Sequence, residues 1–121
     1  MSEEQIALAK RAVECKGFRL MSGMRTHRGE TIDCVDFESG QAYCGEFDVV
    51  ISALPDLTDP ATLGCLLALV REHHKEPRLA VIPNGKGWSV SRVWLRSPHD
   101  RVAGVHTLEA EALVAALEAA P

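Results

Sequence analysis

Four cysteines and five histidines are the residues of this chain that are best suited to chemistry. A histidine beside a cysteine can take the thiol proton and make the sulfur a nucleophile. Cys34 and Cys44 are the candidate nucleophiles, but nothing in the sequence places either one next to a histidine. The chain also lacks the Gly-x-Ser-x-Gly, phosphate-loop and His-Glu-x-x-His motifs. We therefore expect a protein that is not an enzyme, and keep a small thiol hydrolase as the third hypothesis.

Zinc binding is the other chemistry that cysteine and histidine support. Cys65 precedes His73 by eight residues on one predicted helix, whereas structural zinc sites use close pairs of ligands. The adjacent His73 and His74 point in different directions on a helix, and a helix C-terminus favours their protonated form. The segment Asn84-Gly-Lys-Gly87 resembles a phosphate loop only superficially, because it joins two predicted strands and opens no helix. We expect no metal ion and no other cofactor.

Charge is distributed unevenly along the chain, whose net charge is −4. Residues 29–60 hold eight acids and no lysine or arginine, and residues 61–101 hold seven basic residues and three acids. Such segregation can produce two faces of opposite potential, but polar hairpins and loops alone also account for it. The acids that we single out as a possible interaction surface are Asp33, Asp36, Glu38 and Glu46.

A second possible surface alternates aromatic and basic residues. Trp88, Val90, Arg92, Trp94 and Arg96 share one face of a strand if no bulge intervenes. Tryptophans with interleaved arginines can stack on single-stranded bases; the alternative is that both tryptophans are core residues. The sequence pI is near 5.7, whereas nucleic-acid-binding domains typically have a basic pI and a cluster of basic residues. Nucleic-acid binding is therefore the second hypothesis.

Capping signals mark the start of each of the three predicted helices, beginning with the first two. Ser2 and Gln5 form a capping box at the start of the first helix, and Gly17 suits its C-terminal end. Asp59 is expected to cap the second helix, with Pro60 at its first position.

The second helix is apolar over most of its circumference, which predicts burial on more than one side at the centre of the fold. Gly64 costs about 1 kcal/mol relative to alanine inside a helix, and a backbone packed closely against it would explain the glycine. Thr107 is expected to cap the third helix, whose first turn contains Glu109 and Glu111.

The predicted strands form two hairpins. Residues 31–37 pair with residues 42–47, and a two-residue Ser39-Gly40 turn would place Cys44 opposite Val35.

Residues 49–51 extend this first hairpin or add a strand to it. The second hairpin pairs residues 78–82 with residues 88–95 through Asn84-Gly85, the usual type I′ pair. Residues 102–105 form a third short strand.

The element order is helix, two or three strands, helix, two or three strands, helix. This order predicts an α+β fold with a mostly antiparallel sheet of two hairpins, packed with about three helices. A length of 121 residues suits one globular domain spanning residues 1–121. The apolar runs are shorter than the ~20 residues of a membrane span, and the acidic start Met-Ser-Glu-Glu is not a signal peptide. We expect a cytoplasmic protein with reduced thiols and no membrane partner.

Several segments resemble small uncharacterised proteins of tailed bacteriophages and bacterial prophages. Residues 15–24 (CKGFRLMSGM) are similar to a recurrent aromatic segment followed by Met-x-Gly-Met, and residues 54–72 (LPDLTDPATLGCLLALVRE) to a second block. Gly87-Trp88 and residues 109–118 complete the set. The likeness departs after the second block, where a tryptophan often replaces one of the two histidines, and residues 30–50 match nothing in it. The resemblance implies a genomic context and no mechanism.

Elimination and this context together favour an interaction protein. The working hypothesis is a phage- or prophage-type accessory protein that binds another macromolecule, with a protein favoured over a nucleic acid as the partner. The acidic hairpin and the tryptophan-bearing face are the two surfaces on which we expect binding.

Overall fold

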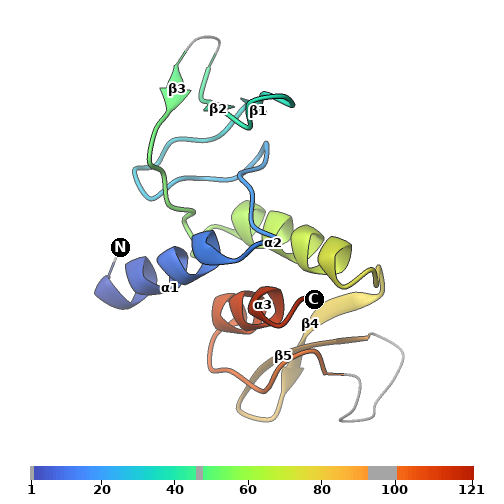
Figure 1. The fold of residues 1–121 in the computed structure, drawn as a ribbon. Coiled ribbons are helices and arrows are strands. Elements are labelled where there is room, and N and C mark those ends of the chain that lie inside the picture. The colour runs from blue at the N-terminus through green and yellow to red at the C-terminus, as the bar shows by residue number, and fades with distance from the viewer. Residues whose placement is uncertain (1, 46–47, 93–100) are drawn as a thin grey trace.

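The fold is a computed structural model that describes residues 2–45, 48–92 and 101–121. These ranges hold three helices and two small antiparallel sheets, which confirms the α+β class and the predicted order of elements (Figure 1). The helices are α1 (Glu3–Glu14), α2 (Pro60–His73) and α3 (Glu109–Glu118). The strands are β1 (Cys34–Val35), β2 (Ala42–Tyr43), β3 (Val49–Val50), β4 (Leu79–Asn84) and β5 (Gly87–Arg92). No helix in the described ranges has the length and apolar character needed to cross a membrane.

The predicted starts of α1 and α2 are confirmed. The Ser2 hydroxyl accepts a hydrogen bond from the Gln5 backbone N–H, and the Gln5 side chain accepts one from the Ser2 N–H. The Asp59 carboxylate accepts from the Thr62 N–H, and Pro60 occupies the first turn of α2. Both caps satisfy N–H groups that a helix start leaves without a partner.

Two other predicted helix boundaries are wrong. The residue that caps α3 is Leu108, which contributes no side-chain hydrogen bond, and Thr107 precedes it. The helix α1 ends at Glu14, so Gly17 is not its terminating residue. Gly17 instead lies against an imidazole, because a Cβ there would be 2.6 Å from Cδ2 of His73.

The helix at the centre of the fold is α3 rather than α2. It packs against α1, α2, β4 and β5, and most of its side chains are buried. The helix α2 buries one face, whereas Gly64 and Ala68 on another face are exposed. The fully or nearly fully buried apolar residues of the three helices are Leu8, Ala9, Ala12, Leu66, Leu69, Val70, Ala110, Ala112, Leu113, Val114, Ala116 and Leu117.

Gly64 has no packing role that requires a glycine, so the expected close backbone approach is wrong. A Cβ at Gly64 would meet nothing within 4 Å. Gly64→Ala is expected to raise the free energy of unfolding by about 1 kcal/mol, because alanine loses less backbone entropy on forming a helix. Urea unfolding of the purified protein measures the change.

Gly17→Ala is the matched control for Gly64→Ala, because it adds the same methyl group at a position without free space. Its new methyl group would meet the His73 ring, so this variant is expected to be destabilised. Equal effects of the two substitutions would contradict the assignment.

The first hairpin has a longer turn than predicted. Cys34 pairs with Tyr43, and Val35 pairs with Ala42, so Cys44 does not lie opposite Val35. Residues 37–40 form a four-residue loop in place of the predicted two-residue turn, which shifts the register by two positions and keeps each side chain on its predicted face.

The second hairpin has its two-residue loop one position later than predicted. Asn84 pairs with Gly87, so the loop residues are Gly85 and Lys86. Of these two, only Gly85 has a positive φ, of 62°, which is the requirement of a type II′ turn rather than type I′.

The predicted strand at residues 102–105 is also absent from the described ranges. This segment instead lies along β5 through two isolated bridges, Ser91 with Arg101 and Trp88 with His106.

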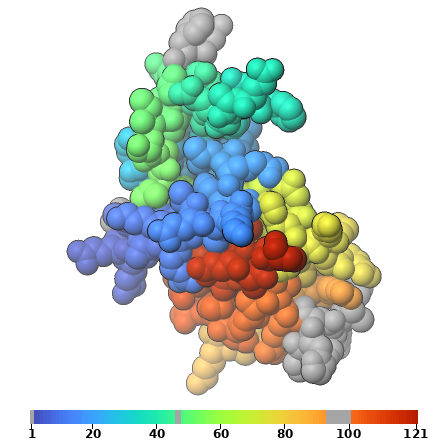
Figure 2. All heavy atoms as spheres, viewed as in Figure 1, coloured from blue at the N-terminus to red at the C-terminus, as the bar shows by residue number. Residues whose placement is uncertain are grey.

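The small sheet β1–β2–β3 stands away from the helices. Its strands have their principal element contacts with one another, and Figures 1 and 2 show it as a projection above the body of the molecule. We call residues 30–50 the acidic arm, and residues 25–29 and 51–56 its base. Among the described residues of the arm, Ile32, Ala42 and Val50 are buried.

Candidate protein-interaction surface

The acidic arm is fixed to the first turn of α2 by a buried threonine. The side chain of Thr62 is fully buried, and its hydroxyl accepts a hydrogen bond of 2.8 Å from the backbone N–H of Arg25. The same hydroxyl donates to Asp59 Oδ2 at 2.9 Å. The Asp56 N–H donates to the Arg25 carbonyl at 2.8 Å. The helix cap and the base of the arm therefore share one hydrogen-bond network.

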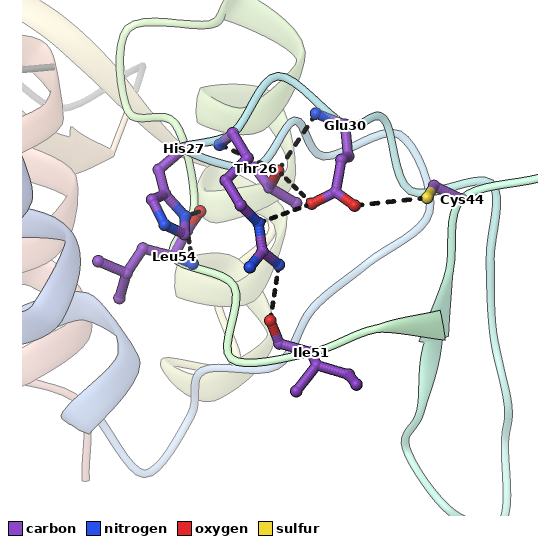
Figure 3. A network of polar contacts seen from close by, with 7 residues as sticks. Thr26, His27, Glu30, Cys44, Ile51 and Leu54 are labelled. Carbon is purple, nitrogen blue, oxygen red and sulfur yellow. Dashed lines mark hydrogen bonds and ion pairs between the residues drawn. The ribbon is translucent and has the colours of Figure 1, made fainter. Parts of the chain in front are cut away.

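Hydrogen bonds between His27 and Leu54 hold together the two segments of the chain at the base of the arm (Figure 3). The His27 N–H donates to the Leu54 carbonyl at 2.8 Å, and the Leu54 N–H donates to His27 Nδ1 at 3.0 Å. Nδ1 accepts this bond, so an uncharged ring carries its proton on Nε2. The imidazole of His27 therefore has a structural role in the arm.

Glu30, the first residue of the arm, accepts three side-chain hydrogen bonds from the described residues. They come from Arg28 Nε at 3.0 Å, Thr26 Oγ1 at 3.2 Å and the Cys44 thiol at 3.6 Å. Desolvation opposes ionisation, but the bonds from Arg28 and Thr26 lower the pKa of Glu30. Arg28 also donates to the Ile51 carbonyl at 2.6 Å. Glu30 and Arg28 thus connect the start of the arm to its end.

This network makes Cys44 a poor nucleophile. Desolvation, followed by the hydrogen bond to Glu30, raises the pKa of the Cys44 thiol. A raised pKa keeps the sulfur protonated near neutral pH, and the thiolate is the reactive form. Cys34 is exposed, and no hydrogen bond joins its sulfur to a histidine in the described part of the chain. Within the described residues, neither candidate cysteine is hydrogen-bonded to a histidine.

A different cysteine and histidine line one cleft. Cys15 and His73 border a cavity of about 480 Å³ between the C-terminal ends of α1 and α3. The ion pair between Arg11 Nη2 and Glu118 Oε1, at 2.6 Å, lies beside it. The Cys15 thiol donates to the Arg11 carbonyl, and burial raises the pKa of this thiol. Protonated Cys15 is accordingly not an activated nucleophile.

The two histidines at the end of α2 have different neighbours. His74 Nε2 lies 2.7 Å from the Ala116 carbonyl of α3, and the His73 ring lies against Gly17. The described ranges contain no group of three or more His, Cys, Asp or Glu side chains arranged to hold a metal ion.

Three of the four acids singled out in the sequence are exposed on the arm. Asp33, Asp36 and Glu38 are solvent-exposed, and within the described ranges none of them forms an ion pair. Glu46 lies outside the described residues. Asp33 accepts from the Gly45 N–H, so part of its carboxylate has a structural role.

Asp36 organises the turn at the tip of the arm. Its carboxylate accepts from the Glu38 N–H at 3.0 Å and from the Ser39 hydroxyl at 2.9 Å. The Glu38 N–H, followed by the Ser39 hydroxyl, lowers the pKa of Asp36. The Glu38 side chain has no hydrogen bond among the residues that the structure describes. Glu38 is thus the exposed acid whose charge is available to a partner.

Phe37 is the feature of the tip that the sequence reasoning missed. Its relative exposure is 101%, although the alternation of residues 31–37 predicts an ordinary strand residue. An aromatic residue between two acids, two positions before a Ser-Gly turn, is the signal that could have identified it.

The tryptophan-bearing face is only partly described. Trp88 is half-buried and packs against the core, and Val90 on the same face is fully buried. Arg92 is exposed and pairs with Glu76 at 3.3 Å. Trp94 and Arg96 lie outside the described residues. The described members of this face thus have structural partners.

Glu76 links the end of α2 to β5 through two arginines. The hydrogen bonds from the Arg78 side chain and backbone, with the charge of Arg92, lower the pKa of Glu76 to about 2. A carboxyl whose pKa falls on folding contributes stability above its ordinary pKa of 4.5, and this contribution disappears as the pH falls from 4.5 to about 2. Glu76→Gln is therefore expected to be less stable than the wild type at pH 7 and to approach it near pH 2.

Thermal unfolding across this pH range measures the Glu76 contribution. Glu14→Gln is the control, because Glu14 is an exposed acid with no ion pair in the described ranges. If the difference in melting temperature between the wild type and Glu76→Gln stays constant with pH, the ion pairs of Glu76 are not its cause.

Comparison with known proteins gives no match for this chain among family models, curated proteins or solved structures. The features that distinguish this protein are therefore structural: an α+β fold and an exposed acidic arm.

Proposed function

We propose that the protein binds another protein through the acidic arm, as a phage- or prophage-type accessory protein in the bacterial cytoplasm. The observation that carries the proposal is the exposure of Asp33, Asp36 and Glu38 on one projecting hairpin, without ion pairs in the described ranges. The resemblance of residues 54–72 to phage and prophage proteins supports the accessory role. That resemblance excludes residues 30–50, so it contributes nothing to the choice of surface.

The charge of the arm favours a basic partner surface. Residues 29–60 contain no lysine or arginine, so the charges of the tip are negative, and Arg25 and Arg28 at the base of the arm are the nearby positive charges along the chain. A field of one sign accelerates association with a surface of opposite sign and disfavours partners of like sign. Nucleic acid is such a disfavoured partner for this surface, because its phosphates are negative.

The test begins with purified tagged protein as bait in bacterial host extract, and with purification of any protein that it retains. The affinity of that protein for the Glu38→Lys variant is then measured. Glu38→Lys replaces one exposed ion pair by a contact between like charges, so it is expected to weaken binding at least fivefold, the equivalent of ~1 kcal/mol. The effect is expected to shrink at high salt, since salt screens exposed charges.

Glu14→Lys is the matched control, because it makes the same charge change at an exposed position on α1. Equal weakening by both variants would show that net charge, rather than the arm, controls binding. Failure to recover any specific protein would contradict the proposed function itself.

A further inference from the structure

Phe37 is a large apolar side chain that contributes nothing to the core. Its ring is fully exposed, at 101%, whereas aromatic side chains commonly bury 150–250 Å² each and dominate core and interface energetics. Water contact with the whole ring is unfavourable at roughly 25 cal/mol per Å² of apolar surface. The free energy that the fold does not gain from this ring is available to a partner that covers it.

The loop that carries Phe37 is held by hydrogen bonds on both sides. The Asp36 N–H donates to the Gln41 carbonyl at 2.7 Å, and the Gly40 N–H donates to the Asp36 carbonyl at 2.8 Å. The Gln41 N–H donates to the Ser39 hydroxyl at 3.2 Å. These bonds close the loop around Phe37, so ordering the loop costs little when a partner binds.

The neighbours of Phe37 define the partner surface. Asp36 and Glu38 flank it and are exposed, and an aromatic anchor with charged residues at its border is a common arrangement at interfaces. We infer that Phe37 inserts into an apolar pocket on a partner protein, and that lysine or arginine side chains border this pocket. This inference rests on the proposed function and adds to it the anchor residue and the chemistry of the partner.

Other occupants of the tip fit less well. A second copy of this chain that paired tip to tip would bring Asp36 and Glu38 against their own copies, and like charges disfavour that contact. An anionic membrane surface would repel the same carboxylates. The experiment therefore treats self-association and lipid contact as outcomes that overturn the inference.

A photoreactive side chain at position 37 tests the contact directly. Phe37 is replaced by p-benzoylphenylalanine in the full-length chain, and the bacterial host is irradiated. The control carries the same group in place of Lys86, an exposed residue at the tip of the β4–β5 hairpin. We expect a protein crosslink from position 37 that is absent from position 86, on a surface peptide with apolar residues beside lysine or arginine.

Several crosslinking outcomes would overturn the inference. They are crosslinks only to a second copy, to nucleic acid or to lipid, identical products from both positions, and no product from position 37.

The partner that the crosslink identifies is then purified and titrated with the wild type and its variants, which measures the contribution of Phe37 to binding. Phe37→Ala is expected to weaken binding at least 30-fold, the size typical of truncating an interface anchor (~2 kcal/mol). The stability of this variant is expected to stay at the wild-type level, because the fully exposed ring is not part of the core. Glu38→Gln is expected to weaken binding only a few-fold.

The two proposals fail in different ways. If Phe37→Ala binds as tightly as the wild type while Glu38→Lys binds more weakly, Phe37 is not the anchor residue. The acidic arm then remains the proposed binding surface. If the wild type binds no protein at all, the proposed function is wrong and the anchor with it.

Discussion

Replacing Gly87 by alanine is expected to lower the free energy of unfolding by about 1–3 kcal/mol, the usual cost of overpacking. A Cβ at this position would lie too close to the carbonyl oxygen of His106 and 2.9 Å from Cγ1 of Val105. The carbonyl belongs to backbone that pairs with β5, since the Trp88 N–H donates to the His106 carbonyl at 2.6 Å and the His106 N–H donates to the Trp88 carbonyl at 2.8 Å. The methyl group would force these two segments apart.

Denaturant unfolding and the fluorescence of the half-buried Trp88 measure the effect of Gly87→Ala. Gly104→Ala is the control, because a Cβ there would meet nothing within 4 Å. This control is expected to change stability by no more than ~0.5 kcal/mol, as most exposed substitutions do. Wild-type stability in Gly87→Ala would show that β5 does not need the close contact with His106.

Replacing Thr62 by valine is expected to lower the free energy of unfolding by about 1–3 kcal/mol and to loosen the acidic arm. Valine has nearly the same shape but no hydroxyl, so the Arg25 N–H would lose its 2.8 Å partner. Leaving this partly buried donor without a partner costs part of its desolvation free energy. The cap of α2 would keep the bond from the Thr62 N–H to Asp59, so the helix itself is expected to remain.

Hydrogen exchange distinguishes local loosening from global unfolding in Thr62→Val. The Arg25 amide and the amides of the arm are expected to exchange faster, whereas those of α3 reflect only the global change. Thr62→Ser restores the hydroxyl and is expected to recover most of the protection. If serine and valine behave alike, the hydroxyl does not anchor the arm.

Local rules account for the parts of the fold that were predicted correctly. The capping box at Ser2 and the Asp59-Pro60 start involve residues that are adjacent along the chain, so the sequence alone specifies them. Thr107 fits the same rule, but the structure uses the neighbouring Leu108 as the cap. The contact of β5 with residues 101–106 depends on chain segments that meet only in the folded state.

Turn chemistry limited what could be inferred about the candidate site. Ser39-Gly40 signals a turn, but the bonds that Asp36 accepts lengthen it to four residues and leave Phe37 at the tip. Charge counting found the acidic segment because it needs no geometry. A pattern of alternating residues predicts on which face of a strand a side chain lies. It does not predict whether other parts of the protein cover that face, so the complete exposure of Phe37 could not be inferred from it.

The separation of the small sheet from the helices has a consequence for how this protein can evolve. Because β1, β2 and β3 have their main contacts with one another, substitutions at the exposed tip leave the packing around α3 unchanged. Mutations there are expected to be nearly neutral for stability, as exposed positions generally are. Selection can therefore change the residues at this tip while the packing of the rest of the chain stays the same.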